Sequence, residues 1–373
     1  NAARSWTLLG NLESPERIAV DRRGLVAARP GSWSLDWWLR VDDEWIFPSE
    51  HGAVRQRLND GAPVVETLIR AAGGDIIHRV YAARSDSEYL IVEVDNRATR
   101  PVALAWAIRP YDHLGGGRVE HIELADRTLY MDGKVGLICG RIPGQMVVGS
   151  GGVDPARSLD TTEDNPKSVV CEQGMATAAL STLLVHGATL RCVVPLGASL
   201  HHDPTSQLPT GDQVARGWGQ HAVSASRFVF PAGHLTDVFD ASRQSLLLAS
   251  TGEDVVPALG APPHTASDEA AVLMALAECG HETVVREILI ARAKRQDRTG
   301  AVIQNNRDMT SATLAAAGRA LELAPDGSLS KALSEFAADG ARWILANPDQ
   351  SAIEGLLSAN QILKTVGADR AAR

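Results

Sequence analysis

Four of the chain's eight tryptophans lie within thirteen residues, and aspartates lie among and beside them. These tryptophans are Trp33, Trp37, Trp38 and Trp45. Carbohydrate sites combine a flat apolar surface with a few well-placed polar groups, so Trp33 and Trp37 are candidates for stacking on a sugar. Asp36 and Asp42 would then bind its hydroxyls. The alternative is a pair of strands whose indoles fill a sandwich core, since each indole buries a large area. Both interpretations stay open.

Acidic residues also occur where helices are expected to begin. Asp268 and Glu269 open one predicted helix, Asp308 opens another, and Glu354 lies in a predicted loop. Paired carboxylates are what acid–base cleavage of a glycosidic bond requires. Acids at helix starts also complement the positive end of the helix dipole, and that role is sufficient by itself.

The remaining residues with chemical potential form no familiar site. Adjacent histidines such as His201 and His202 point to opposite faces of a strand, so they predict no metal site. The glycines at 115–117 lack the helix and lysine of a phosphate cradle, and there is no nucleophile elbow. The four cysteines stand far apart and are interpreted as small buried hydrophobes. We expect no metal and no cofactor.

The composition is that of a globular protein. The chain has 373 residues, 45% hydrophobic and 22% charged, which excludes collagenous and disordered classes and suggests two domains. The 36 basic and 45 acidic residues give a net charge of −9, which argues against nucleic acid and anionic membranes as partners. No apolar stretch reaches the roughly 18 residues of a membrane span, and no signal peptide is evident. These features favour the cytoplasm, although a mature secreted chain would look similar.

Residues 1–236 are expected to form a β-sandwich domain. Their apolar residues alternate or occur in short runs such as 89–95 and 102–108, with turn signals between the runs. Asp132-Gly133 between two such runs is a strong hairpin signal. Many short strands without helices between them predict an antiparallel sandwich.

Residues 237–373 change to a helical period. Ser267 is the expected N-cap of the second helix and Gly280 its stop. Short connections between these helices predict consecutive helical hairpins, so the fold class is α+β and multidomain. Predicted helices cover 240–249, 267–277, 282–295, 310–323, 329–345 and 360–370.

A β-sandwich that leads directly into Ala- and Leu-rich helical hairpins resembles the six-hairpin glycosidases, which include glucoamylase, bacterial trehalase and glycogen-debranching enzymes. Short motifs carry the resemblance in both halves of the chain. They are Val92-Glu-Val-Asp-Asn96 with Pro101-Val-Ala-Leu104, Pro262-Pro-His264 with Asp268-Glu-Ala-Ala271, Arg295-Gln-Asp-Arg-Thr-Gly300, and Asp308.

The resemblance implies an N-terminal supersandwich followed by an (α/α)6 toroid. It also implies hydrolysis of an α-linked glucoside or oligosaccharide with inversion of configuration. Among the acids, Glu354 then corresponds to the general acid and Asp308 to the base or a sugar ligand. His264, Asp268 and Glu269 would contribute to substrate binding.

The chain departs from this family in two ways. Ala266 and Ser267 replace an aromatic residue and an arginine that usually contact the sugar. Only 137 residues follow residue 236, enough for about six helices where the toroid has twelve. Alternatives are a non-catalytic glycan-binding or protein-interaction descendant, or a fragment of a longer glycosidase. An open arc of helices would expose an apolar flank, which predicts a homodimer or a second chain that completes the toroid.

Overall fold

The computed structural model describes residues 5–29, 32–71, 73–151, 153–159, 165–197, 207–231, 233–256, 265–305 and 307–368. The chain divides into two compact units, and the division falls between Gly219 and Gln220, with residues 12–15 belonging to the second unit. The expected domain boundary after residue 236 lies further along the chain, inside the second unit.

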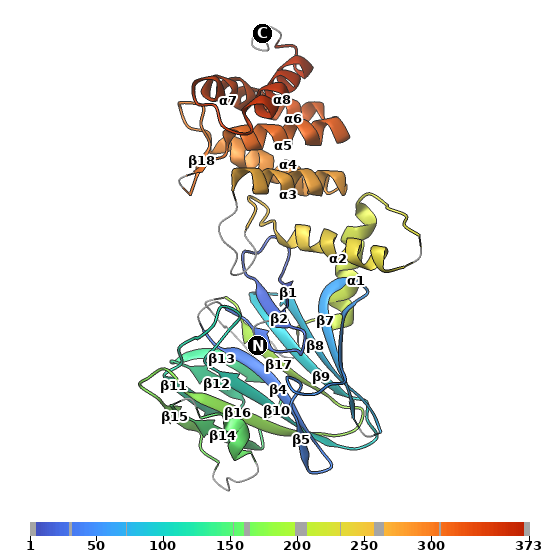
Figure 1. Cartoon of the computed structure of the whole chain (residues 1–373), viewed down its shortest axis with the longest axis vertical. Helices are drawn as coiled ribbons and strands as arrows, with labels where there is room; N and C mark the ends of the chain where they lie inside the picture. The colour runs from blue at the N-terminus through green and yellow to red at the C-terminus, as the bar shows by residue number, and fades with distance from the viewer. Residues whose placement is uncertain are drawn as a thin grey trace. The chain divides into compact units, whose positions relative to one another are not determined.

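The described residues of the first unit form two antiparallel sheets (Figure 1). In spatial order, the eight-stranded sheet contains β1 (Trp6–Leu9), β2 (Ile18–Asp21), β3 (Val26–Ala27), β4 (Ser34–Val41), β10 (Val102–Arg109), β16 (Thr177–Leu184) and β14 (Gln145–Gly149), with β5 (Glu44–Ile46) paired to β4. The nine-stranded sheet contains β15 (Ser168–Val170), β11 (His121–Ala125), β12 (Thr128–Met131), β13 (Lys134–Cys139), β17 (Thr189–Pro195), β9 (Glu88–Asn96), β8 (Gly74–Arg84), β7 (Ala62–Ala71) and β6 (Val54–Asn59). The expected antiparallel sandwich is confirmed.

The Asp132-Gly133 hairpin is also confirmed. It joins β12 to β13, with Met131 opposite Lys134. Asp132 and Gly133 both have positive φ, 50° and 74°, as a two-residue type I′ turn requires. The four cysteines are buried and free, as small core residues would be.

Side-chain alternation along β4 decides how the tryptophans are used. Trp37 lies between the two sheets and faces Trp106 across the β4–β10 pair. Trp38 lies on the other face of the same sheet, in a small cluster that includes Leu159. Leu159 directly follows the 3₁₀ turn η1 (Pro155–Ser158). Successive strand residues point to opposite faces, so neighbouring residues of β4 serve two separate clusters.

The second unit contains most of the helices, and α1 crosses the division between the units. The helices are α1 (Gly211–Ser224), α2 (His234–Leu248), α3 (Ala266–Glu278), α4 (Glu282–Lys294), α5 (Thr310–Leu323), α6 (Gly327–Ala332), α7 (Ser334–Ala346) and α8 (Ala352–Thr365). A short hairpin of β18 (Ile303–Gln304) and β19 (Arg307–Asp308) precedes α5.

Several expected helix limits are wrong. The N-cap of α3 is Thr265 and not Ser267, because Thr265 and Asp268 form a reciprocal capping box. The last helix begins at Ala352 and not at Asn360, which places Glu354 in a first turn and not in a loop. The predicted helix 329–345 is interrupted at Leu333 and becomes α6 and α7. Sequence reasoning missed α1 entirely.

Helix α5 lies between α3 and α8, and we call these three packed helices the helical layer. It is buried almost all round and packs against both α3 and α8. A Cβ on Gly355 would lie 3.0 Å from the backbone of Ser311, so glycine lets α8 approach α5 closely. No helix among the described residues is long and apolar enough to cross a membrane.

Candidate functional site

Three helices of the second unit run side by side in the same direction. At their amino ends, Arg307 before α5 pairs with Glu269 of α3; towards their carboxyl ends, Arg319 of α5 pairs with Glu278 of α3. The contact of Gly355 with Ser311 likewise places the start of α8 beside the start of α5. The first residues of α3, α5 and α8 therefore lie along one edge of the helical layer, which we call the N-terminal edge.

The sequence-predicted acids gather at this edge. Asp268 and Glu269 are in the first turn of α3, Asp308 is two residues before α5, and Glu354 is in the first turn of α8. The N-terminal edge thus brings together four of the residues proposed from the sequence. Their local roles differ.

Asp308 is half-buried and its carboxylate has a fixed orientation. Oδ1 accepts a hydrogen bond from the Thr310 backbone N–H at 2.9 Å, and Oδ2 accepts one from the indole Nε1 of Trp343 at 2.6 Å. Each carboxylate oxygen has two lone pairs, so both oxygens can accept a further hydrogen bond. Trp343 comes from the far end of α7, and sequence reasoning did not identify it.

Glu354 is exposed beside Gly355. Among the described residues its carboxylate has no hydrogen-bonding or ion-pair partner. It is therefore available to a ligand at the N-terminal edge. Asp268, by contrast, is engaged in the capping box, where Oδ2 accepts from the Thr265 backbone N–H at 2.9 Å.

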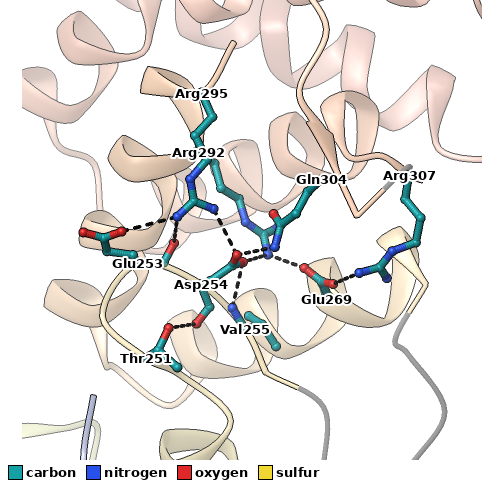
Figure 2. Close-up of polar contacts among 9 residues, drawn as sticks. All are labelled: Thr251, Glu253, Asp254, Val255, Glu269, Arg292, Arg295, Gln304 and Arg307. Carbon is teal, nitrogen blue, oxygen red and sulfur yellow. Dashed lines mark hydrogen bonds and ion pairs between the residues drawn. The ribbon is translucent and has the colours of Figure 1, made fainter. Parts of the chain in front are cut away.

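Glu269 is 1% exposed and belongs to a buried ion network (Figure 2). Arg292, which is fully buried, donates through Nη2 to Glu269 and, at 2.8 Å, to Asp254. Arg307 donates to the other Glu269 oxygen at 3.1 Å. This network ties α3 and α4 to the hairpin that carries Asp308.

Asp254 is the second acid of the network. Burial by itself raises its pKa, but hydrogen bonds and charge from Arg292 and Arg295 outweigh burial and hold the pKa below its usual value. Gln304 also donates to Asp254, which anchors β18. Sequence reasoning missed this cluster, yet one signal was present: Arg292 follows Val285, Ile288 and Leu289 on the apolar face of α4.

Several polar atoms in this cluster lack partners. The described residues offer no hydrogen-bonding partner to Nε and Nη1 of Arg292, Nη1 of Arg307 or Oε1 of Gln304. Buried polar groups are almost always satisfied, by protein or by ordered water. These atoms leave hydrogen-bonding capacity for water or a polar ligand beneath the N-terminal edge.

The aromatic residues proposed from the sequence lie in the sandwich and form no single surface. Trp37 is fully buried, donates from Nε1 to the Arg23 carbonyl at 3.0 Å, and stacks on His78. This placement favours the core interpretation for Trp37. Asp36 points to the opposite face, so these two residues cannot line one platform.

Asp36 is buried against Arg109, whose Nη1 lies 3.2 Å from Oδ2. Burial raises the pKa of Asp36, and the Arg109 charge opposes that rise. Asp42 is an exposed residue of the β4–β5 turn and pairs with Arg100 at 2.7 Å. Trp33 is half-buried and lines a cavity of the sandwich.

Two of the sequence-based assignments cannot be placed. His264 lies outside the described residues, as do His201 and His202. Among the described residues, no group of three or more His, Cys, Asp or Glu side chains is arranged to hold a metal ion.

Comparison with known proteins gives similarity in structure only. No protein-family model matches the chain, and no curated protein matches it. A solved structure named as a kojibiose phosphorylase from the human microbiome matches 95% of this chain and 56% of its own chain, with a TM-score of 0.51 and 9% identity. A family GH92 α-mannosidase from Bacteroides thetaiotaomicron matches over 98% and 60%, with a TM-score of 0.38 and 7% identity.

The chain therefore spans somewhat more than half the length of these solved structures. At such low identity the first similarity concerns the fold alone. The similarity to the structure named as a kojibiose phosphorylase extends over 95% of this chain, so it includes both the antiparallel sheets and the helices that follow them. The expected α+β class is confirmed at that level.

Proposed function

We propose that this protein acts on carbohydrate, with its site at the N-terminal edge of α3, α5 and α8. The substrate class is an α-linked glucoside or oligosaccharide, and the reaction is cleavage with inversion. The proposal rests on two carboxylates at this edge: Asp308, which is oriented by Trp343, and Glu354, which is exposed in the first turn of α8.

The two acids differ in a way that suits different roles. Inversion needs one carboxylic acid to protonate the leaving oxygen and one carboxylate, roughly 6.5–9.5 Å away, to activate water. Asp308 is oriented by two N–H donors and is the candidate base, because a base must hold its water in line. Glu354 is solvent-accessible and is the candidate acid.

The ion network is the support for this pair. The network holds the β18–β19 hairpin against α3 and so fixes the segment that carries Asp308. Its members are Asp254, Glu269, Arg292 and Arg307. Both oxygens of Glu269 accept hydrogen bonds from arginines, so we assign Glu269 a positioning role and not a role as a sugar ligand. Asp268 is likewise engaged by protein groups, as part of the helix cap.

A second candidate is a protein that binds saccharide without cleaving it. The observation that favours it is the small number of unengaged acids, since Asp268 and Glu269 are both occupied by protein groups. A site with one oriented aspartate and one exposed glutamate would still bind sugar hydroxyls. Saccharide binding without turnover would favour this second role over the first.

We also propose that the helical layer is completed by a second copy of the chain. Helix α8 exposes Ile353 and Leu357, at 75% and 67%, and these residues are four apart on one helix face. Leu345 at the end of α7 is 71% exposed. An apolar face of this kind fits a partner helix.

The test is an NMR assay of the full chain with trehalose, maltose and kojibiose, each with and without inorganic phosphate. The proposal predicts a β-anomeric product. Turnover should be lost in Asp308→Asn and Glu354→Gln and retained in Glu335→Gln. Glu335 is an exposed first-turn acid of α7, which runs opposite to α5, so it is a matched control. Turnover that survives both site variants overturns the catalytic assignment.

A further inference from the structure

A cavity of about 190 Å³ opens in the sandwich, and among the candidate site residues of the sequence analysis only Trp33 lines it. It lies between residues 28–29 and 32–33, the β12–β13 turn and the end of β17. Its polar and aromatic walls are Arg29, Trp33, Arg118, Asp132 and Lys134. At about 30 Å³ per water molecule, the volume corresponds to roughly six waters, the size of one sugar ring.

The type I′ turn fixes the backbone that carries two of these side chains. Asp132 and Lys134 flank Gly133, so both are held at the rim of the cavity. Oδ1 of Asp132 accepts from the backbone N–H groups of Glu120 and His121, at 2.9 and 2.8 Å. This leaves Oδ2 to accept a hydrogen bond from a ligand hydroxyl.

The cavity carries positive charge on a chain whose net charge is −9. Lys134 is exposed, and among the described residues no carboxylate pairs with it. Among the described residues, Arg29 donates to two backbone carbonyls, those of Pro195 at 3.1 Å and Leu196 at 2.6 Å. Arg118, in contrast, is neutralised by Glu120.

These groups are complementary to one kind of ligand. Trp33 offers an aromatic wall to the face of a ring, and Asp132 offers an acceptor to hydroxyls. Lys134 and Arg29, which form no ion pair among the described residues, offer two cations to an anion. We propose that the cavity binds a pyranose that bears one anionic group, either a carboxylate or a phosphate. This site is independent of the N-terminal edge and stands or falls separately from the proposed function.

Calorimetric titration of the full chain tests the proposal with four probes: D-glucuronate, glucose 6-phosphate, glucose and inorganic phosphate. We expect at least one anionic sugar to bind about tenfold more tightly than glucose, because charge-assisted hydrogen bonds are the strong ones. The tighter of the two anionic sugars identifies the anionic group. Inorganic phosphate should bind more weakly than either sugar that binds, since it lacks the ring.

Two variants locate the binding. Lys134→Gln should weaken the anionic sugar about tenfold and leave glucose unchanged. The matched control is Lys331→Gln, an exposed lysine of α6, which should change nothing. Trp33→Phe should remove the ligand-induced change in tryptophan fluorescence, whereas Lys134→Gln should keep it at saturation.

Three results would overturn the site. The first is that neither anionic sugar binds more tightly than glucose. The second is that Lys134→Gln behaves like Lys331→Gln. The third is that inorganic phosphate binds as tightly as the sugars, which would indicate a simple anion contact without recognition of a ring.

Discussion

The indole Nε1 of Trp343 donates a 2.6 Å hydrogen bond to Oδ2 of Asp308, and this bond joins the end of α7 to the start of α5. A Cβ on Gly300 would lie 3.3 Å from the Trp343 Cβ, so the chain before the β18–β19 hairpin also packs closely on this tryptophan. Trp343 therefore helps to set the direction of the Asp308 carboxylate at the N-terminal edge.

Replacement of Trp343 by phenylalanine should release Asp308 while keeping most of the apolar packing. Loss of one hydrogen bond to a charged group predicts a decrease of about 1.5–3 kcal/mol in unfolding free energy. If Asp308 is the base, turnover should fall more than substrate affinity. Urea unfolding and steady-state kinetics measure both quantities. An unchanged kcat in a folded Trp343→Phe protein would contradict the orienting role.

Arg292 should be the most sensitive residue of the ion network. Arg292→Leu leaves Glu269 and Asp254 buried without their shared cation, which predicts a loss of about 3–5 kcal/mol in unfolding free energy. Arg319→Leu is the control, because Arg319 pairs with Glu278 and Glu322 at the surface and should matter little. Equal losses in chemical denaturation would show that the network does not anchor the hairpin.

Much of the helical unit follows from its sequence, and the exceptions have physical reasons. The predicted helix 310–323 matches α5, because a long Ala- and Leu-rich run outweighs the single Gly318 within it. The start of α8 was misplaced because Gly355 weakens a helical pattern, while its actual role is close packing on Ser311. Trp343 and Arg292 enter the site through contacts between distant segments, which periodicity does not encode.

The sandwich was predicted in class and partly in detail. The Asp132-Gly133 turn could be identified because a type I′ turn requires these residue types. The use of the tryptophans could not be identified in this way. Alternation sends Trp37 and Trp38 to opposite faces, but only the pairing of β4 within the sheet decides which of them lies between the two sheets.

His78 should make stability depend on pH. Complete burial lowers its pKa to about 3, whereas the ordinary value is 6.5. Below pH 6.5 the unfolded chain therefore binds a proton at His78 that the folded chain excludes. The stability that the neutral His78 contributes is fully present above pH 6.5 and is lost as the pH falls towards 3. At about 1.4 kcal/mol per pH unit, wild type should lose about 2 kcal/mol relative to His78→Phe between pH 7 and pH 5.

Unfolding of both proteins in urea at several pH values measures this difference. His78 stacks on Trp37 with ring centroids 4.6 Å apart, and phenylalanine keeps an aromatic ring there. Parallel pH profiles for the two proteins would show that His78 does not remain neutral in the core.

The exposed face of α8 predicts self-association. Light scattering should give a mass of about twice 39.7 kDa, and Ile353→Ser should shift the protein to monomer. Ile142→Ser is a matched control, because Ile142 is 67% exposed in the first unit. A wild-type monomer at every concentration would remove the proposal that a second copy completes the helical layer.

We expect an α-linked saccharide to bind at the N-terminal edge, whether or not it is cleaved. Saturation-transfer NMR with trehalose, maltose and kojibiose tests this most directly. We predict transfer from the protein to at least one of these sugars, with loss of the signal in the folded double variant Asp308→Asn/Glu354→Gln and its retention in Glu335→Gln. Absence of transfer to all three sugars, or transfer unchanged in the double variant, would rule out a saccharide site at the N-terminal edge.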